Sequence, residues 1–249
     1  MRHTTTTLAL LGLVVGAVGC NQPTVGHFGD GAYYHTRGHY RIRYAGDDPE
    51  LLPPTRWRLT NYGRDEETGQ PTHAEPGHYG YSRYDVAWLT GQPRLSRHSF
   101  SVPTVDLHYA AREGSGEIWV RTMVLPTAWR NASAGEALHG ALQAVGNTQL
   151  PLDPLGHRFA PSSTRITSYG PATIDERQGH YTELEVEGAG GDTQRVTLVA
   201  LRPGGHEYRW HRRHHFPMMV VFGCASAPGD HARVRADLER LVRRVDIRR

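Results

Sequence analysis

The chain contains no lysine, only two cysteines and, beyond its first twenty residues, no apolar run long enough to cross a membrane. All 28 basic residues are arginine, and with 25 acidic residues they give a formal net charge of +3. Codon usage is the simplest explanation of this composition. The alternative is selection for the planar guanidinium group, which binds carboxylate and phosphate with two parallel hydrogen bonds. The absence of lysine excludes a phosphate-binding loop at the glycines around Ala189, because that loop needs a lysine and a following helix.

The first twenty residues have the composition of a secretory signal. Arg2 supplies a positive charge, an apolar run extends over residues 8–18, and Gly19 provides a small residue before Cys20. A membrane-spanning helix needs about 20 apolar residues, whereas polar residues follow the cysteine at once. We therefore predict a signal peptide over residues 1–19.

The four residues Ala17-Val18-Gly19-Cys20 resemble the lipobox of bacterial lipoproteins. The resemblance implies that Cys20 receives a diacylglyceryl group and then an amide-linked acyl chain such as palmitate. Each buried methylene contributes about 0.8 kcal/mol, so two or more chains would anchor the protein stably to a membrane. Asn21 resembles the pattern that does not retain lipoproteins in the inner membrane, which favours the outer membrane or the periplasmic face of the cell envelope. The alternative is an ordinary signal peptide, which would leave Cys20 as a free thiol.

Cys224 has no intramolecular partner if Cys20 carries lipid, so we expect no disulfide framework. It follows the apolar run Met218–Gly223, which is typical of a buried strand. A catalytic thiol would need a neighbouring base to lower its pKa. The sequence favours a small buried hydrophobe at this position.

Removal of residues 1–19 from the 249-residue chain leaves 230 residues, enough for one sizeable domain or two small ones. Tyrosine, glycine, proline and histidine are frequent up to about residue 95. Alternation of apolar and polar residues there predicts short strands with one solvent-exposed face. Such strands are expected at residues 39–44, 57–62 and 79–88, with a long acidic loop at residues 64–77. We divide the chain into a signal peptide (1–19), a tether (20–30), a β-rich segment (31–95) and an α+β domain (96–249).

Patterns beyond residue 96 are more regular. Ser133 followed by Glu136 is a capping box that predicts a helix through Val145. Asp230 is expected to cap a C-terminal helix with apolar residues at helical spacing. Alternation and apolar runs predict strands at residues 104–109, 117–125, 165–168, 172–175, 180–186, 196–201, 207–212 and 218–224, the first two joined by a hairpin. The fold class predicted is α+β, with two helices packed on an antiparallel sheet.

This order of elements resembles the PsbP-like α/β/α sandwich over residues 100–247. The resemblance rests on the helix after Ser133, the strand at residues 196–201 and the closing helix at residues 230–245. It implies a binding or assembly scaffold without chemistry of its own. The whole chain is also similar to lineage-specific lipoproteins of GC-rich bacteria. Function must still be argued from a site.

Positive charge is concentrated in residues 205–249, which hold ten arginines and five acidic residues. A basic face there would suit anionic lipid headgroups or an acidic partner. The alternative is a solvated helix surface, because spacing of four residues allows ion pairs on the last helix. The expected pairs are Arg233 with Asp237, and Arg235 and Arg243 with Glu239, which would leave Arg240 and Arg244 unpaired.

The sixteen histidines invite a metal hypothesis, above all four that lie close together near the C-terminus. Neutral imidazoles bind zinc or copper, and two of the four are expected in a turn. The interleaved arginines would oppose a divalent cation, and no HExxH or CxxC spacing is present. An exposed polar turn is therefore the favoured interpretation of His206, His211, His214 and His215, and we predict no metal site and no cofactor.

Hydrolase motifs are not found either. The sequence has no G-x-S-x-G elbow, and Ser115 between two glycines reads as a hairpin tip. We predict a membrane-anchored envelope lipoprotein that acts as a non-catalytic binding or assembly module. Its expected partners are the membrane, through lipid on Cys20, and an envelope protein or anionic surface, but not nucleic acid. The alternative is a secreted metal-binding protein or hydrolase that uses the His/Arg-rich C-terminal segment.

Overall fold

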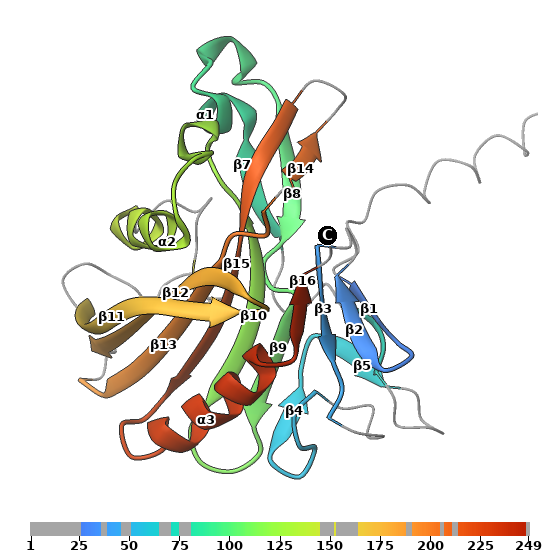
Figure 1. Ribbon diagram of the computed structural model, residues 1–249, viewed down its shortest axis with the longest axis vertical. Helices are drawn as coiled ribbons and strands as arrows, with labels where there is room; N and C mark the ends of the chain where they lie inside the picture. Colours follow the sequence, from blue (N-terminus) through green and yellow to red (C-terminus); the bar gives the residue numbers. More distant parts are fainter. Residues whose placement is uncertain are drawn as a thin grey trace, which may run out of the picture.

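The computed structural model describes residues 26–35, 39–45, 51–64, 71–74, 81–144, 152, 164–187, 191–204, 207–210 and 214–247. Its main feature is an eight-stranded antiparallel sheet in the order β11-β12-β13-β15-β10-β9-β4, with β14 paired to β15 (Figure 1). The strands are β4 (Trp57–Leu59), β9 (Leu107–Ala111), β10 (Glu117–Val124), β11 (Thr164–Ile174), β12 (Arg177–Glu187), β13 (Thr193–Leu201), β14 (Glu207–Trp210) and β15 (His214–Ser226).

Two helices cover opposite faces of this sheet (Figure 1). Helix α2 (Ala134–Gln143) packs its apolar side on residues of β12, β13 and β15. Helix α3 (His231–Val242) packs on the other face, where Val234, Leu238 and Leu241 join the larger core cluster. The predicted α+β class is confirmed, and α2 and α3 cover the main sheet because a sheet with two apolar faces needs a covering layer on each. The prediction of two helices on one sheet is incomplete, because the structure has a third helix and further sheets.

A second, four-stranded sheet has the order β1-β2-β3-β16 and packs on the α3 side of the main sheet. Its strands are β1 (Gly26–Gly29), β2 (Ala32–His35), β3 (Tyr40–Arg43) and β16 (Val245–Ile247). Strand β16 comes from the C-terminus, whereas β4 of the main sheet comes from the N-terminal segment. Each sheet therefore combines strands from both of the segments that the sequence separates at residue 96.

A third helix was not predicted. The expected strand over residues 79–88 is β7 (Tyr81–Asp85) followed directly by α1 (Val86–Thr90). The chain turns into a helix because the Asp85 side chain accepts a hydrogen bond from the Ala87 amide, and Gly91 ends the helix at φ 67°. Strand β7 pairs with β8 (Ser99–Pro103), and a 3₁₀ turn at Pro93–Leu95 lies between them.

The acidic stretch at residues 64–77 is not entirely a loop. Strands β5 (Tyr62–Arg64) and β6 (Pro71–Ala74) pair there as a short antiparallel ribbon, and residues 65–70 and 75–80 lie outside the described residues. Proline at the first position of β6 is compatible with a strand, because that position need not donate to the ladder.

The two strands predicted at residues 165–168 and 172–175 are one continuous strand, β11. The prediction separated them at Gly170 and Pro171, which are unfavourable inside a central strand. They are tolerated here because β11 is the edge strand of the main sheet. The strand returns into β12 through Asp175 and Glu176, both at positive φ, as tight hairpin turns require.

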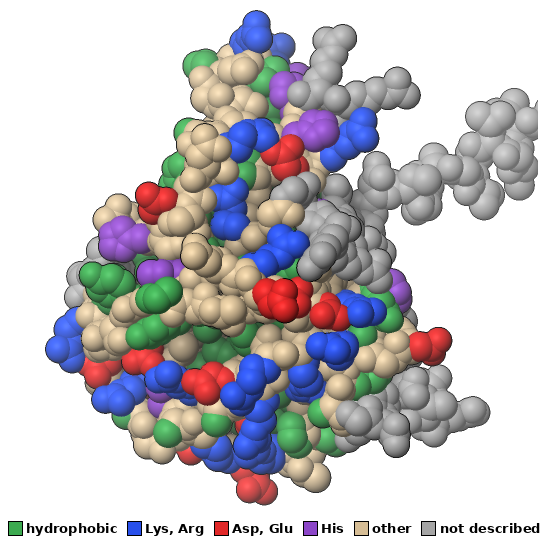
Figure 2. All heavy atoms as spheres, viewed as in Figure 1, with side chains coloured by type: hydrophobic (Ala, Val, Ile, Leu, Met, Phe, Trp, Pro, Cys, Tyr) green, Lys and Arg blue, Asp and Glu red, His purple; other side chains and the backbone are tan. Residues whose placement is uncertain are grey.

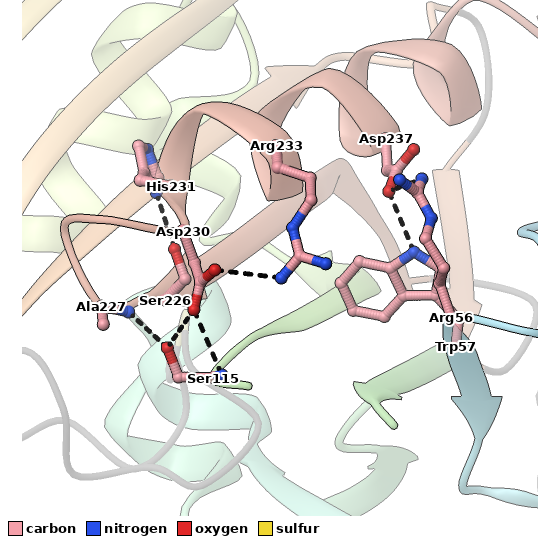
Figure 3. A network of polar contacts seen from close by, with 9 residues as sticks. All are labelled: Arg56, Trp57, Ser115, Ser226, Ala227, Asp230, His231, Arg233 and Asp237. Carbon is pink, nitrogen blue, oxygen red and sulfur yellow. Dashed lines mark hydrogen bonds and ion pairs between the residues drawn. The ribbon is translucent and has the colours of Figure 1, made fainter. Parts of the chain in front are cut away.

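Helix α3 begins where predicted, but Asp230 does not cap it with its side chain. The carboxylate instead accepts hydrogen bonds from the amide and hydroxyl of Ser115, at 3.3 and 3.2 Å, and from Arg233 at 3.0 Å (Figure 3). Ser115 lies at the tip of the β9–β10 hairpin, as predicted, and its hydroxyl accepts the Ala227 amide. These bonds hold the hairpin tip against the start of α3.

Farther along α3, Asp237 is almost fully buried and joins the helix to strand β4. It accepts hydrogen bonds from the Trp57 indole N–H at 3.0 Å and from Arg56 (Figure 3), and a further bond from Arg240 at 2.9 Å. The predicted pair of Asp237 with Arg233 is therefore wrong. A buried carboxylate needs several donors, and the tertiary fold supplies two of them from β4 and its preceding residue.

A buried carboxylate also lies between the two sheets. Asp106 accepts hydrogen bonds from the Tyr40 hydroxyl at 2.9 Å and the Thr122 hydroxyl at 2.5 Å. Burial raises the pKa of Asp106 to about 6, although both hydrogen bonds oppose the shift. The cluster joins β3 of the small sheet to β10 of the main sheet.

Candidate ligand-binding cleft

Two of the three exposed large hydrophobic side chains of the described residues lie on β11. Ile166 is 40% exposed and Tyr169 is 70% exposed. An irregularity at Thr167 places one extra residue between them, so both side chains point to the α2 face instead of to opposite faces. Figure 2 shows hydrophobic and histidine side chains together on the surface over α2 and β11.

These side chains border a cleft of about 560 Å³ between α2 and the β11–β12 hairpin. Its size is typical of small-molecule sites. The strand side presents Ile166, Tyr169, His180 and Thr182, and the register pairs Tyr169 directly with Thr182. The helix side presents Ser133, Gly135, Glu136, His139, Gly140 and Gln143.

The geometry of α2 follows from its sequence. Ser133 and Glu136 form the predicted capping box, with both reciprocal hydrogen bonds present. His139 and Gln143, one helical turn apart, are joined by a hydrogen bond of 2.9 Å. Gly135 lets the helix approach β12 closely, because a Cβ atom there would lie 2.8 Å from the His180 ring nitrogen. The helix therefore forms one wall of the cleft, close against β12.

The cleft surface is mainly apolar and carries a few polar side chains. Burial, and secondly the neighbouring His139, lowers the pKa of His180, so its ring is neutral at pH 7 and can donate or accept one hydrogen bond. The Glu136 carboxylate is held by the Ser133 amide, which lowers its pKa. The Tyr169 and His180 rings lie 6.1 Å apart. The surface thus combines two exposed apolar side chains with neutral hydrogen-bonding groups and one carboxylate, Glu136, which is already held by Ser133.

A second groove runs between α3 and the other face of the sheet, and its charged groups bond to one another. Arg235 pairs with Glu183 and, as predicted, with Glu239. Arg195 and Arg165 pair with Glu185. Because these pairs satisfy the charges within the groove, we do not assign a ligand to it.

His231 is the one histidine of this groove, and it lies between two buried hydroxyls. Its ring nitrogens lie 3.0 Å from the Thr197 hydroxyl and 3.2 Å from the Ser226 hydroxyl. Burial lowers its pKa. Serine and histidine in contact are typical of nucleophilic catalysis, but Ser226 is only 3% exposed. The contact fixes the start of α3 rather than presenting a hydroxyl to substrate.

Of the four histidines in the metal hypothesis, His206 and His211 lie outside the described residues. The prediction that His214 and His215 lie in a turn is wrong, because they are the first two residues of strand β15. Successive side chains of a strand point to opposite faces. His214 stacks against Phe216, whereas His215 lies 3.5 Å from Glu207. Within the described ranges, no three His, Cys, Asp or Glu side chains converge on a point that would hold a metal.

Cys224 is fully buried on β15, as predicted, and burial raises its pKa to about 12. The thiol is therefore protonated and inert at neutral pH. Cys20, the predicted lipidation site, lies outside the described residues.

The C-terminal arginines do not form a face of one sign. Figure 2 shows acidic and basic side chains interleaved over α3 and its neighbours. Arg240, expected to be unpaired, bonds to Asp237, and Arg244 donates to the Leu51 and Arg240 carbonyls. The predicted pair of Arg243 with Glu239 is absent from the ion pairs of the described part of the chain. Arg240 and Arg244 thus find partners within one turn of the same helix, and Arg244 finds one more, Leu51, far away in the sequence.

The sequence predicted the helix wall of the cleft but not the cleft itself. The capping box marked the start of α2, whereas Ile166 fell in the strand predicted at residues 165–168 and Tyr169 fell in the break after it. The spacing of three between two apolar residues of one strand was the available signal, since it indicates a bulge when both face the same side. The site was identified from the exposure of the Ile166 and Tyr169 side chains in the structure.

No protein-family model and no curated protein sequence matches this chain. Among solved structures, the chain is similar to LpqN, which is described as involved in cell envelope biogenesis of Mycobacterium tuberculosis. The sequence identity is 8% and the TM-score is 0.40, and the match covers 80% of this chain and 82% of LpqN. The chain is also similar to cyanobacterial PsbP (CyanoP) from Synechocystis sp. PCC 6803, with 10% identity, a TM-score of 0.40 and coverage of 91% and 99%. A PsbP protein is thus among the structural neighbours, but similarity at this level carries no information on ligand or activity.

Proposed function

We propose that this chain is a lipid-anchored protein of the cell envelope that acts as a non-catalytic binding module, with its ligand in the cleft between α2 and β11. The observation that carries the binding proposal is the exposure of Ile166 and Tyr169 over a cleft of ligand size. Exposed apolar side chains grouped at a concave surface mark binding sites more often than single ones do.

The cleft defines the chemistry of its ligand. A ligand with an apolar or aromatic part would cover Tyr169 and Ile166, and each Å² removed from water contributes about 25 cal/mol. Aromatic groups also stack on tyrosine with a further 0.5–1.5 kcal/mol or so. Polar groups of the same ligand would bond to the neutral His180 ring and to Thr182. The proposed ligand is therefore amphiphilic and uncharged at the part that enters the cleft.

The anchor is argued from the lipobox ending at Cys20. Among the described residues, no helix is long and apolar enough to cross a membrane. We expect mass spectrometry of protein isolated from native membranes to find a peptide that begins at acylated Cys20. A Cys20→Ser variant should remain unprocessed or leave the membrane fraction. An unmodified mature chain in the soluble fraction would contradict the anchor and favour a secreted protein.

The cleft is tested with the fluorescent amphiphile 1-anilinonaphthalene-8-sulfonate. We expect Ile166→Ser combined with Tyr169→Ser to weaken its binding by at least about tenfold, because roughly 1.4 kcal/mol of apolar contact is lost. Folding should be unaffected, since both side chains are exposed.

The matched control is Tyr81→Ser, which removes the third exposed large hydrophobic, on β7 outside the cleft. It should leave the affinity unchanged. Equal affinity in the double variant and the natural chain would show that the dye binds elsewhere and would contradict the cleft proposal.

A further inference from the structure

The small sheet has an apolar inner face and a polar outer face. Phe28, Tyr33, Ile42 and Val245 lie opposite one another across its four strands and face the core. Because side chains alternate along a strand, the neighbouring positions must point outward. The outward positions of this sheet are therefore supplied by both ends of the chain.

One row of outward side chains crosses the whole sheet. The register pairs His27 with Tyr34, Tyr34 with Arg41, and Arg41 with Asp246. The His27 and Tyr34 rings stack at 5.3 Å, and Arg41 and Asp246 form an ion pair of 2.7 Å. Arg43 lies two residues farther along β3, 3.6 Å from the same Asp246 carboxylate and with 59% of its side chain exposed. We call these five residues the outer row.

Both ends of the described chain meet at one end of this sheet. Gly26 is paired with His35 and Ile247 with Tyr40, and the His35 and Tyr40 rings stack at 5.0 Å. Arg248 and Arg249 follow Ile247 directly in the sequence.

The link from the lipid-bearing residue to the sheet is short. Gly26 comes six residues after Cys20, and six residues span at most about 20 Å when fully extended. That is shorter than a typical small domain is wide. A chain anchored at Cys20 cannot turn freely above the membrane, and the edge strand β1 must stay close to the lipid headgroups.

From these observations we propose that the outer row is the membrane-facing surface of the protein and rests on anionic lipid headgroups. The proposal depends on the anchor proposed above. The face carries two arginines against one aspartate, and two further arginines follow Ile247 in the sequence. Arginine binds phosphate through a planar fork, and tyrosine is suited to a boundary between apolar and wet surroundings.

This surface would bind a membrane only weakly by itself, because Asp246 offsets part of its charge. Attachment through Cys20 makes the contact intramolecular and raises the effective concentration of headgroups around it. Helix α2 and strand β11, which border the cleft, lie on the opposite side of the molecule from the small sheet and so away from the membrane in this orientation (Figure 1). Its ligand would then come from the surrounding space rather than from the supporting bilayer.

The test uses the acylated full chain in vesicles of phosphatidylcholine and phosphatidylglycerol that contain brominated lipid. A fluorophore is attached to cysteine in either a His27→Cys or a Tyr169→Cys variant. Cys224 should not compete for the label, because it is fully buried. We expect several-fold stronger quenching at position 27 than at position 169. Equal quenching at both positions, or stronger quenching at 169, would overturn the proposal.

Charge-reversal variants show whether quenching at position 27 comes from contact with the headgroups or only from the shortness of the tether. Arg41→Glu with Arg43→Glu should reduce quenching at position 27, whereas Arg94→Glu with Arg97→Glu, exposed arginines outside the small sheet, should not. Unchanged quenching in the first pair would overturn the contact with anionic lipid. Mass spectrometry of the same sample reports acylation: an unacylated chain contradicts the anchor itself, whereas an acylated chain without the difference contradicts only the orientation.

Discussion

Replacing Gly223 with alanine is expected to lower the free energy of unfolding by about 3 kcal/mol or more, because overpacking in a central strand has few routes of relief. Gly223 lies in the middle of β15, directly opposite Trp119 of β10. The indole covers the position that a Cβ atom would occupy. The indole is fully buried, and its N–H donates to the Leu152 carbonyl at 3.1 Å. Alanine would therefore displace the ring and break this bond.

Urea denaturation of the leaderless chain carrying Cys20→Ser, followed by tryptophan fluorescence, measures the effect. Gly229→Ala is the matched control, since nothing lies within 4 Å of its added Cβ atom; it should change stability by less than about 0.5 kcal/mol. In a Trp119→Leu background, Gly223→Ala should lose less than about 1 kcal/mol, because the overlap is gone. An equal loss in both backgrounds would show that the indole is not the cause.

The free energy of unfolding of the natural chain is expected to decrease by about 3 kcal/mol between pH 4 and pH 7, and Asp106→Asn should abolish this decrease. Burial raises the pKa of Asp106 from 3.8 to about 6 in the folded chain. In this range the folded chain keeps a proton that the unfolded chain has released, so its free energy of unfolding decreases as pH rises through about 6. Asparagine has no proton to lose, and its side-chain oxygen still accepts from Tyr40 and Thr122.

The groups around Asp106 do not reverse this sign. Tyr33, Tyr40 and Tyr62 have raised pKa values and stay neutral, and the charge of Arg121 is already among the effects that lower the Asp106 pKa. The His35 Nε2 atom lies 3.9 Å from the Asp106 carboxylate. His180 and His231 have lowered pKa values and reduce stability below about pH 6.5, so the comparison is between variant and natural chain at each pH.

Chemical denaturation at intervals between pH 4 and pH 8 gives the difference curve. The exposed Asp192→Asn variant is the matched control and should follow the natural chain within about 0.5 kcal/mol. Parallel curves for Asp106→Asn and the natural chain would mean that Asp106 is ionised throughout, and would contradict the account of this cluster.

Elements with strong local signals were predicted correctly. The capping box at Ser133 and Glu136 defines the start of α2, and the apolar run before Cys224 defines the buried strand β15. Errors occurred where a local preference was overruled by position in the sheet. Gly170 and Pro171 interrupt a central strand but not an edge strand.

The sequence by itself determined the leader pattern ending at Cys20, the α+β class, the α2 helix and the burial of Cys224, because these follow from side chains within a few positions of one another. The anchoring at Cys20 stays a prediction. Only the tertiary structure decided the cleft, the buried carboxylates and the outer row. Their contacts join residues far apart in the chain: 66 positions separate Tyr40 from Asp106, 180 separate Trp57 from Asp237, and 205 separate Arg41 from Asp246. No local period encodes such pairs, because they form only when two sheets and two helices pack against one another.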